Sequence, residues 1–313
     1  MRMFAGTRKY TLIGFLTIII WGTSAIFTRN LSTNIGAYTS AALVNLIGGI
    51  VVLVQQGVKK EGLQEWRSVP RRYWPICGGL FIIYTASSYV SMSMVESDEA
   101  VVTLVLIRFL WPLFTLIFTI PILKAKASPW LIGGVSVSMS GIIVAKLGEA
   151  VLDLPGFLHN VLSGDDMAGY LMGFVVAVSW GIYTNLTKKY VGMKRVDGVG
   201  IYMVITAAVL GAIAFFTDEP RRFTADLTGQ ILYAGVVVGS LANVMWNLAI
   251  KKGNMLLVVL ASNFLPIIST VMTSFMLGVG ITVPILAGSL LVVIGTLWSK
   301  TCFRHFDASG NTD

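Results

Sequence analysis

Charged side chains are scarce in this sequence. Asp, Glu, Lys and Arg make up 12% of the 313 residues, while 55% of the residues are hydrophobic. An average soluble domain carries roughly 25% charged residues, so this chain has about half the usual share. Its mean hydropathy of +0.79 places it with proteins that expose apolar side chains to lipid. The first partner that the composition predicts is therefore the lipid bilayer.

Residue types that carry chemistry are also rare. The two cysteines, Cys77 and Cys302, lie in an apolar run and in the C-terminal segment, which does not indicate a disulfide framework. The two histidines, His159 and His305, have no partners at metal-ligand spacing, so we expect no metal site and no cofactor. No glycine-rich phosphate loop ending in Lys-Ser or Lys-Thr is present, so the signature of an ATP-driven pump is missing. An enzyme would need a nucleophile–base pair or a metal cluster, and we expect neither.

Apolar runs long enough to cross a bilayer recur along the whole chain. About 17–25 residues span the hydrocarbon core as a helix. The first run has no small-residue cleavage site after it, so we expect it to remain as a span. The sequence predicts an all-α integral membrane protein with ten transmembrane helices, at residues 11–28, 36–55, 74–95, 99–123, 129–146, 168–187, 199–217, 228–250, 254–278 and 284–300.

Basic residues indicate the orientation. Most of the 23 lysines and arginines lie in the N-terminal arm and in the segments 59–72, 124–126, 188–195, 251–252 and 300–304. The alternate segments hold only Arg29, Lys146, Arg221 and Arg222. This asymmetry predicts cytoplasmic N- and C-termini in a multi-pass protein of the plasma (inner) membrane. Because the basic clusters lie between spans, we expect no nucleic-acid partner.

The chain contains an internal repeat. Leu12, Gly14, Phe15, Trp21, Gly22 and Thr28 fall on Leu171, Gly173, Phe174, Trp180, Gly181 and Thr187, and Pro112, Thr119, Gly134 and Gly141 fall on Pro266, Thr273, Gly288 and Gly295. We predict five-helix repeats at 11–146 and 168–300, an outer linker at 147–167 that could form an interfacial helix, and a tail at 301–313. An odd number of spans inverts the second repeat, which places a binding site near the midplane.

These features resemble a known group of proteins. Two inverted five-span repeats with "WGTSAIFTR" at 21–29 and "RFLWP" at 108–112 resemble the EamA-like drug/metabolite transporter superfamily. Within it, "FLWP", "YTNLTKKY" at 183–190, "MWNLAIKKGN" at 245–254 and "SNFLPIIST" at 262–270 resemble the YddG-type aromatic amino-acid exporters. The resemblance implies passage of amino acids by alternating access. It departs at Arg108, where those exporters carry a neutral asparagine.

Arg108 and Pro112 interrupt the apolar fourth span. Arg108 lies nine residues after Glu99, about 13 Å into a helix that crosses a ~30 Å core. Its exposure to lipid would cost at least ~2.5–3.5 kcal/mol, so it should face protein or a cavity. Pro112 removes a hydrogen bond to the carbonyl of Arg108, and Pro266 does the same to Ser262. Two interpretations stay open: Arg108 binds a substrate carboxylate, or it is satisfied by freed backbone and holds helices together.

Other polar and aromatic positions recur at helical spacing. We predict that they line the central cavity and bind a small-molecule substrate by stacking and hydrogen bonds. The predicted binding residues are Arg108, Trp111, Trp21, Tyr84, Ser88, Trp180, Tyr183, Asn243, Trp246, Asn247 and Asn263, with Pro112 and Pro266 as kink or gating positions.

No Asp or Glu lies deep within a predicted span. A carrier without a buried acid is most simply a facilitator of amino acids, aromatic or other neutral ones. The alternative is proton-coupled efflux of drugs or other small metabolites, with Glu96 or Glu99 at the outer mouth as the proton site. A monomer is expected, and a dimer remains open.

Overall fold

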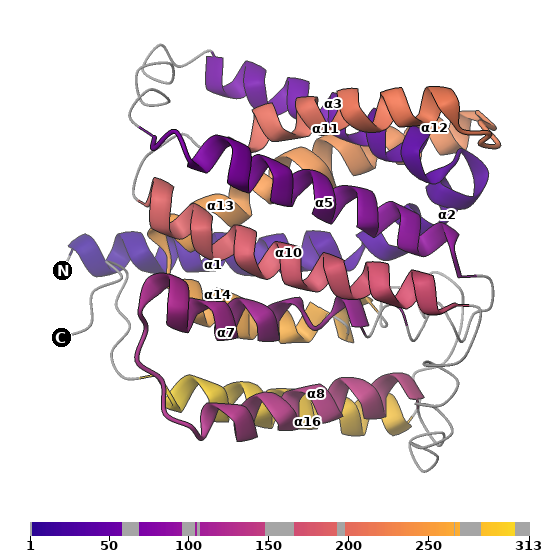
Figure 1. The fold of residues 1–313 in the computed structure, drawn as a ribbon. Coiled ribbons are helices and arrows are strands. Elements are labelled where there is room, and N and C mark those ends of the chain that lie inside the picture. The colour runs from indigo at the N-terminus through magenta and orange to yellow at the C-terminus, as the bar shows by residue number, and fades with distance from the viewer. Residues whose placement is uncertain are drawn as a thin grey trace.

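A computed structural model describes residues 2–57, 69–95, 104, 107–147, 166–192, 198–265, 267–269 and 283–303. In these residues the secondary structure is helical apart from one isolated bridge between Ala127 and Phe303 (Figure 1). The helices are α1 (Arg2–Gly22), α2 (Ser24–Asn34), α3 (Ala37–Gly57), α5 (Tyr73–Ser93), α7 (Trp111–Leu123), α8 (Leu131–Leu147), α10 (Met167–Val191), α11 (Val199–Phe216), α12 (Ala225–Tyr233), η2 (Ala234–Leu241), α13 (Ala242–Lys252), α14 (Met255–Ala261), η3 (Ser262–Phe264) and α16 (Val283–Thr301).

Five described helices are long and apolar enough to cross a membrane. They cover Ala37–Gln56, Tyr73–Ser93, Met167–Val191, Val199–Phe216 and Ala225–Lys252. Helices α1 and α2, bent by 42° at their junction, form a sixth span if they are taken together. Four shorter apolar helices cover Trp111–Leu123, Leu131–Gly141, Met255–Ser269 and Leu286–Ser299.

The fourth predicted span shows why some of these helices are short. Helix α7 begins at Trp111 and has Pro112 in its first turn, where a missing backbone N–H leaves no bond unmade. Phe109 and Leu110 form a turn just before it. Its 13 residues rise only about 20 Å, which is less than the hydrocarbon thickness. The chain is therefore broken before Pro112 instead of kinked after it.

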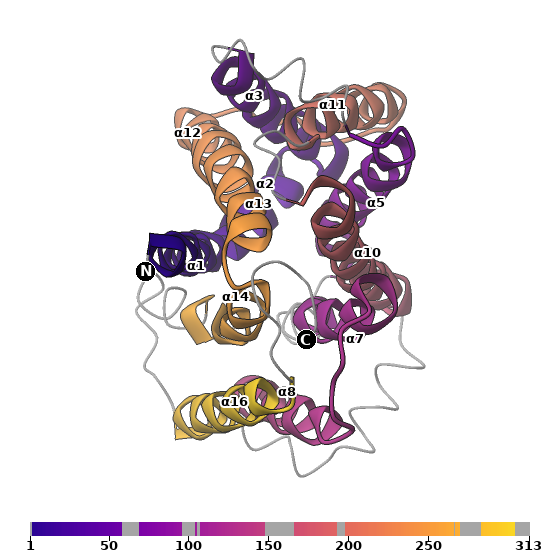
Figure 2. The same ribbon diagram turned by 90° about the vertical axis from the view of Figure 1, so that its left-hand side faces the viewer.

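The helices pack as a ring with one pair set to the side (Figure 2). Helix α10 contacts α5 and α7, and α1 contacts α13 and α14. Helix α3 packs along α11, and α8 packs along α16. The α8–α16 pair approaches to backbone contact: an ideal Cβ on Gly141 would lie 2.6 Å from the Gly288 carbonyl oxygen, and one on Gly295 would lie 2.6 Å from that of Gly134. Small residues allow such close approach between membrane helices.

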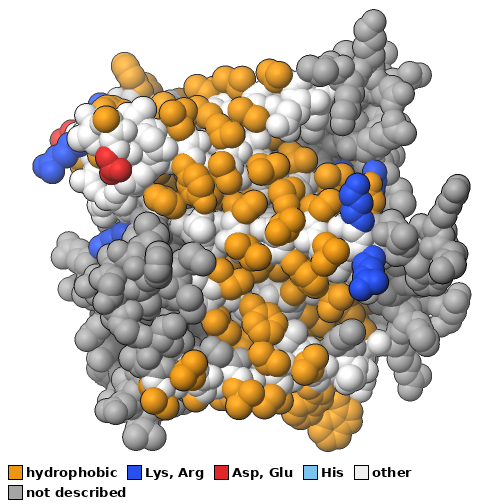
Figure 3. Space-filling view, turned by 180° about the vertical axis from the view of Figure 1, so that it is seen from behind, with side chains coloured by type: hydrophobic (Ala, Val, Ile, Leu, Met, Phe, Trp, Pro, Cys, Tyr) orange, Lys and Arg blue, Asp and Glu red, His pale blue; other side chains and the backbone are white. Residues whose placement is uncertain are grey.

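Charge differs between the two ends of the bundle. The end at which α1 and α5 begin and α10 and α13 end, here called the basic end, carries Arg71, Arg72, Lys188, Lys189, Lys251 and Lys252. There the Lys188 ammonium donates to the Lys251 carbonyl over 2.8 Å. Between the two ends, hydrophobic side chains cover the middle of the face in Figure 3. This belt is the surface that lipid would contact.

The opposite end, here called the far end, is tied together by polar contacts. Arg29 donates to the carbonyls of Met92 and Val95 over 2.7 and 2.8 Å. The carboxylate of Glu219 accepts from the backbone N–H groups of Tyr38 and Thr39 over 2.7 and 2.8 Å. Glu219 thereby caps the first turn of α3, where the N–H groups have no partner within the helix.

Candidate functional site

A cavity of about 160 Å³ lies inside the ring of helices. On α5 its lining runs from Phe81 to Met92, so the cavity occupies the half of the bundle toward the far end. Trp21 and Thr28 line it from α1 and α2, beside the bend at which the two helices meet. The cavity is thus placed by the break in the first span and by the ring arrangement of the helices.

Seven of the predicted binding residues line this cavity. They come from five different segments of the chain, which the folded ring brings together. They are Trp21, Tyr84, Ser88, Arg108, Trp111, Trp180 and Asn243.

Arg108 is half-buried and lies at the wall of the cavity next to α5 and α10. Its Nη2 donates to Ser88 Oγ over 2.5 Å. Its aliphatic stem passes close to Gly173, where an ideal Cβ would be 3.5 Å from Arg108 Cγ. Among the described residues no carboxylate pairs with this guanidinium, and Arg108 is part of the cavity lining.

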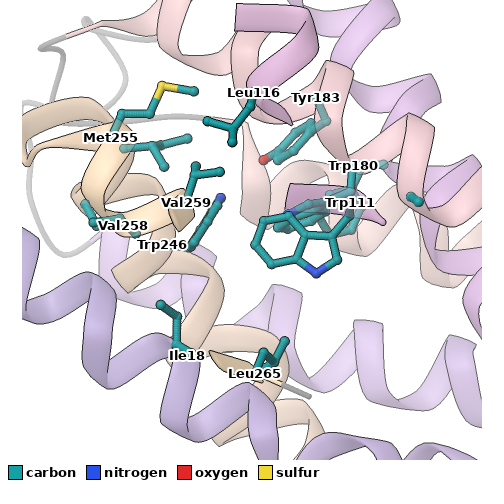
Figure 4. Close-up of a cluster of buried hydrophobic side chains, with 14 of the residues drawn as sticks. Ile18, Trp111, Leu116, Trp180, Tyr183, Trp246, Met255, Val258, Val259 and Leu265 are labelled. Atoms are coloured by element: carbon teal, nitrogen blue, oxygen red, sulfur yellow. The ribbon is translucent and has the colours of Figure 1, made fainter. Parts of the chain in front are cut away.

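Four tryptophans form one cluster beside Arg108. Trp21, Trp111, Trp180 and Trp246 come from α1, α7, α10 and α13, and each ring contacts the other three, with centroid separations from 5.0 to 6.5 Å. Four of the six pairs are edge-to-face, which is an arrangement that aromatic quadrupoles favour, and the other two are tilted. Figure 4 shows Trp111, Trp180 and Trp246 with Tyr183 among aliphatic side chains. This cluster, here called the tryptophan cluster, joins both halves of the chain.

Three predicted residues lie behind the wall of the cavity and not on it. Trp246 is fully buried within the tryptophan cluster. Tyr183 is also fully buried, and its hydroxyl accepts from Asn247 Nδ2 over 3.4 Å. These side chains support the aromatic wall from the side of the basic end.

Asn263 points toward a different part of the bundle. Its Nδ2 donates to Thr296 Oγ1 on α16 over 3.4 Å, and it does not line the cavity. The polar face predicted along the fourth span is likewise used for packing. Thr119 Oγ1 donates to Asn185 Oδ1 over 2.9 Å, and Asn185 Nδ2 donates to the Thr115 carbonyl over 2.9 Å. These contacts fasten α7 to α10.

Three predicted positions fall outside the described residues. They are Pro266, Glu96 and Glu99. Most of the predicted linker at 147–167 and of the tail at 301–313 falls outside as well.

The lining also includes polar residues that the sequence reasoning did not single out. Asn45 on α3 is the most informative of them. Its Nδ2 donates to the Ala41 carbonyl over 2.8 Å. A lone asparagine in the apolar run 36–55 was the available signal, because an amide in a membrane helix needs a partner or a cavity.

A π-helical turn brings Asn243 to the cavity. Ala234, Val238 and Gly239 of η2 and Asn243 of α13 all line it. In an uninterrupted α-helix, the nine positions from Ala234 to Asn243 would make about two and a half turns and place the two residues on opposite sides. The wider π-helical turn removes this offset, in keeping with the frequent use of π-bulges at functional sites.

Aromatic side chains fill the bundle between the cavity and the basic end. Tyr73 is fully buried and contacts Tyr202, Trp74 and Tyr190, with centroid separations of 5.6, 5.7 and 6.4 Å. The Tyr202 hydroxyl donates to the Tyr73 carbonyl over 3.2 Å. This group, here called the tyrosine plug, packs α5, α10 and α11 against one another near the basic end.

The sequence matches transporters along most of its length. The EamA-like transporter family matches residues 8–147 and 167–301. The chain is 25% identical over 299 residues to the "Aromatic amino acid exporter YddG" of Salmonella typhimurium (strain 14028s / SGSC 2262), covering 94% of this chain and 98% of that protein. It is 24% identical over 298 residues to the protein of the same name from Escherichia coli (strain K12), with the same coverage of 94% and 98%.

A solved crystal structure has the same fold. It superposes with a TM-score of 0.77 at 21% identity, over 95% of this chain and 99% of that chain. Because the family match extends over most of the sequence, the chain belongs to the EamA-like transporter family and is a multi-pass membrane transporter.

Proposed function

We propose that this protein exports amino acids, or facilitates their passage, through the central cavity by alternating access. The preferred substrates are aromatic or other neutral amino acids, and transport, not catalysis, is the activity. The relatives named as aromatic amino acid exporters support this proposal through similarity along the whole chain.

One observation carries the proposal: Arg108 faces a cavity walled by aromatic rings and has no carboxylate partner among the described residues. Guanidinium groups bind carboxylates with two parallel hydrogen bonds. Because Ser88 holds one arm of the guanidinium, the remaining N–H groups are available to a ligand. The aromatic wall then suits a flat or apolar side chain attached to that carboxylate.

The size of the cavity agrees with a single small solute. Cavities of about 150 Å³ bind benzene-sized molecules, and the volume here is about 160 Å³. Trp21, Trp111 and Trp180 line the cavity, so the aromatic ring of a substrate can contact several indole rings at once. A charged anchor beside such a wall favours amino acids over purely apolar solutes.

We also propose ten spans in two inverted repeats at 11–146 and 168–300, as the sequence predicts. Packing at matched glycines supports this arrangement. An ideal Cβ on Gly14 would meet Val258, and one on Gly173 would meet Leu104. Val258 and Leu104 are equivalent under the same offset that relates Pro266 to Pro112.

Two further glycine pairs follow the same rule. Gly22 packs against Ile268 and Gly181 against Phe114, while Gly141 packs against Gly288 and Val292, and Gly295 against Gly134 and Ser138. Each of these contacts joins one predicted repeat to the other, and each has a counterpart in which the two repeats exchange places. The family also matches the chain in two segments, 8–147 and 167–301.

The unequal distribution of basic residues between the two ends supports an orientation in the membrane and a conformational state of the transporter. We propose that the basic end faces the cytoplasm of a cell with this protein in its plasma membrane, because lysine and arginine accumulate on that side. The tyrosine plug then closes the cytoplasmic route while the cavity lies toward the outside. Alternating access requires the plug to separate in the opposite state.

The test is transport in proteoliposomes that contain the purified protein. Wild type should move aromatic and neutral amino acids, and Arg108→Asn should weaken competition by carboxylate-bearing ligands without removing the aromatic preference. Competition by amino acids that Arg108→Asn leaves unchanged would show that the guanidinium is structural. Uphill movement driven by an imposed pH gradient would instead favour proton-coupled efflux.

A further inference from the structure

Two asparagines in the cavity hold their amide groups in the same way. Asn45 Nδ2 donates to the Ala41 carbonyl over 2.8 Å, and Asn243 Nδ2 donates to the Gly239 carbonyl over 2.6 Å. In both cases the acceptor lies four residues earlier on the same helix. Because a backbone carbonyl can only accept, the amide nitrogen must face it and the amide oxygen must lie on the other branch.

These two amide oxygens are available to a ligand. Neither accepts a hydrogen bond from a described residue, and both asparagines line the cavity. The buried amide of Asn185 is different, because its oxygen accepts from Thr119 and its nitrogen donates to two carbonyls. Asn185 is thus satisfied by packing, whereas Asn45 and Asn243 keep an acceptor toward the cavity.

The two asparagines lie on adjoining elements. An ideal Cβ on Gly239, whose carbonyl holds Asn243, would be 3.8 Å from Val44 Cγ1, next to Asn45 in sequence. Arg108 approaches the cavity beside α5 and α10 instead, where Ser88 and Gly173 contact it. In the end-on view, α13 and α10 belong to different sides of the ring (Figure 2). The cavity therefore has a donor wall at Arg108 and an acceptor wall at the two amides.

We propose that Asn45 and Asn243 form an ammonium subsite, in which both Oδ1 atoms accept hydrogen bonds from the positive amino group of the substrate. This subsite rests on the proposed function and narrows the class of substrates to those that carry an ammonium group. Arg108 alone would accept any aromatic carboxylate, whereas the acceptor wall selects zwitterions. An ammonium group has three donors and no acceptor, which is the complement of two amide oxygens.

The test is equilibrium binding of three probes to the purified full-length protein, with tryptophan fluorescence as the signal. Phenylalanine carries both charged groups, 3-phenylpropionate lacks the ammonium, and 2-phenylethylamine lacks the carboxylate. We expect Asn45→Leu and Asn243→Leu each to lower the ratio of phenylalanine affinity to 3-phenylpropionate affinity roughly tenfold, as for loss of a hydrogen bond to a charged group.

Further variants separate this role from a structural one. Asn45→Asp and Asn243→Asp lose the N–H donor but keep an acceptor, so each should preserve the discrimination. Asn34→Leu is the matched control, because Asn34 Nδ2 makes the same bond to the Asn30 carbonyl over 2.9 Å but does not line the cavity. Thermal unfolding of every variant shows whether it is folded. If a leucine variant does not fold, the aspartate variant at the same position decides whether the acceptor oxygen is needed for discrimination.

Several results would overturn the proposal. One is an unchanged ratio in both leucine variants, and another is equal loss in the leucine and aspartate variants. Binding that requires Na⁺ in place of the ammonium group would assign the two oxygens to a metal ion. Discrimination in binding without any transport of amino acids would support the subsite and overturn the proposed function alone.

Discussion

Arg108 donates a hydrogen bond to Ser88 Oγ over 2.5 Å, and this bond joins the broken fourth span to α5 at the wall of the cavity. It fixes one arm of the guanidinium. Because the guanidinium is planar, the same hydrogen bond also orients its other arm. The orientation of the charge therefore depends on the Ser88 hydroxyl. Ser88 is therefore a positioning residue for the proposed carboxylate anchor.

Replacement of this hydroxyl should weaken carboxylate binding. We expect Ser88→Ala to reduce the affinity for phenylalanine about threefold to tenfold, which corresponds to one ordinary hydrogen bond. Equilibrium binding measures the effect, and Ser87→Ala is the neighbouring control because Ser87 is buried but does not line the cavity. Equal losses in both variants would mean that α5 itself had been disturbed.

The close contact between α8 and α16 should not tolerate a methyl group. An ideal Cβ on Gly141 would lie 2.6 Å from the Gly288 carbonyl oxygen and 2.7 Å from Val292 N. We expect Gly141→Ala to lower the free energy of unfolding by about 1–3 kcal/mol. The midpoint of thermal unfolding in detergent checks this. Gly79→Ala is the control, because a Cβ at Gly79 meets nothing within 4 Å, so this change should not lower the midpoint and should raise it slightly, since alanine is the better helix former.

The cap on α3 should contribute stability at the far end. Glu219 accepts from two backbone N–H groups and from Thr39 Oγ1. We expect Glu219→Ala to destabilise the protein by about 0.5–2 kcal/mol, as for loss of a helix cap. Thermal unfolding and proteolysis of the 217–224 segment report the change. The exposed neighbour Asp218 provides the control, and an equal effect of Asp218→Ala would point to general charge instead of capping.

Separation of the tyrosine plug during transport should expose a buried thiol. Cys77 is fully buried one turn beyond Tyr73, and the chain has only one other cysteine, Cys302. In a Cys302→Ser background, we expect substrate to change the rate at which a maleimide labels Cys77. Mass spectrometry measures the labelling. A rate that stays at zero in the presence of substrate would contradict opening at the basic end.

Much of the cavity could be predicted from the sequence because polar and aromatic residues at helical spacing mark one face of an otherwise apolar membrane helix. Trp21, Tyr84, Ser88 and Trp180 repeat at helical spacing, and a charged residue such as Arg108 cannot face lipid at low cost. The depth of each position follows from its distance to the end of the apolar run. Those rules placed seven predicted residues at the cavity.

The remaining features depend on tertiary contacts that periodicity cannot supply. Thr119 and Asn263 have the same apparent polarity as the lining residues, yet Asn185 and Thr296 take up their hydrogen bonds. Trp246 is spaced like a lining residue, but it closes the tryptophan cluster from behind. The break before Pro112 also shortens a span that hydropathy alone would read as continuous.

The π-helical segment makes the cavity sensitive to how one helix is wound as well as to which residues it contains. If the same residues, Ala234–Leu241, were wound as a regular α-helix, Asn243 would lie on the side of the helix opposite to Ala234. Asn243 would leave the acceptor wall, and a neighbour of other chemistry would enter it. A change between the two kinds of winding at this point would therefore change which side chains the transporter presents to a ligand, although the sequence stays the same.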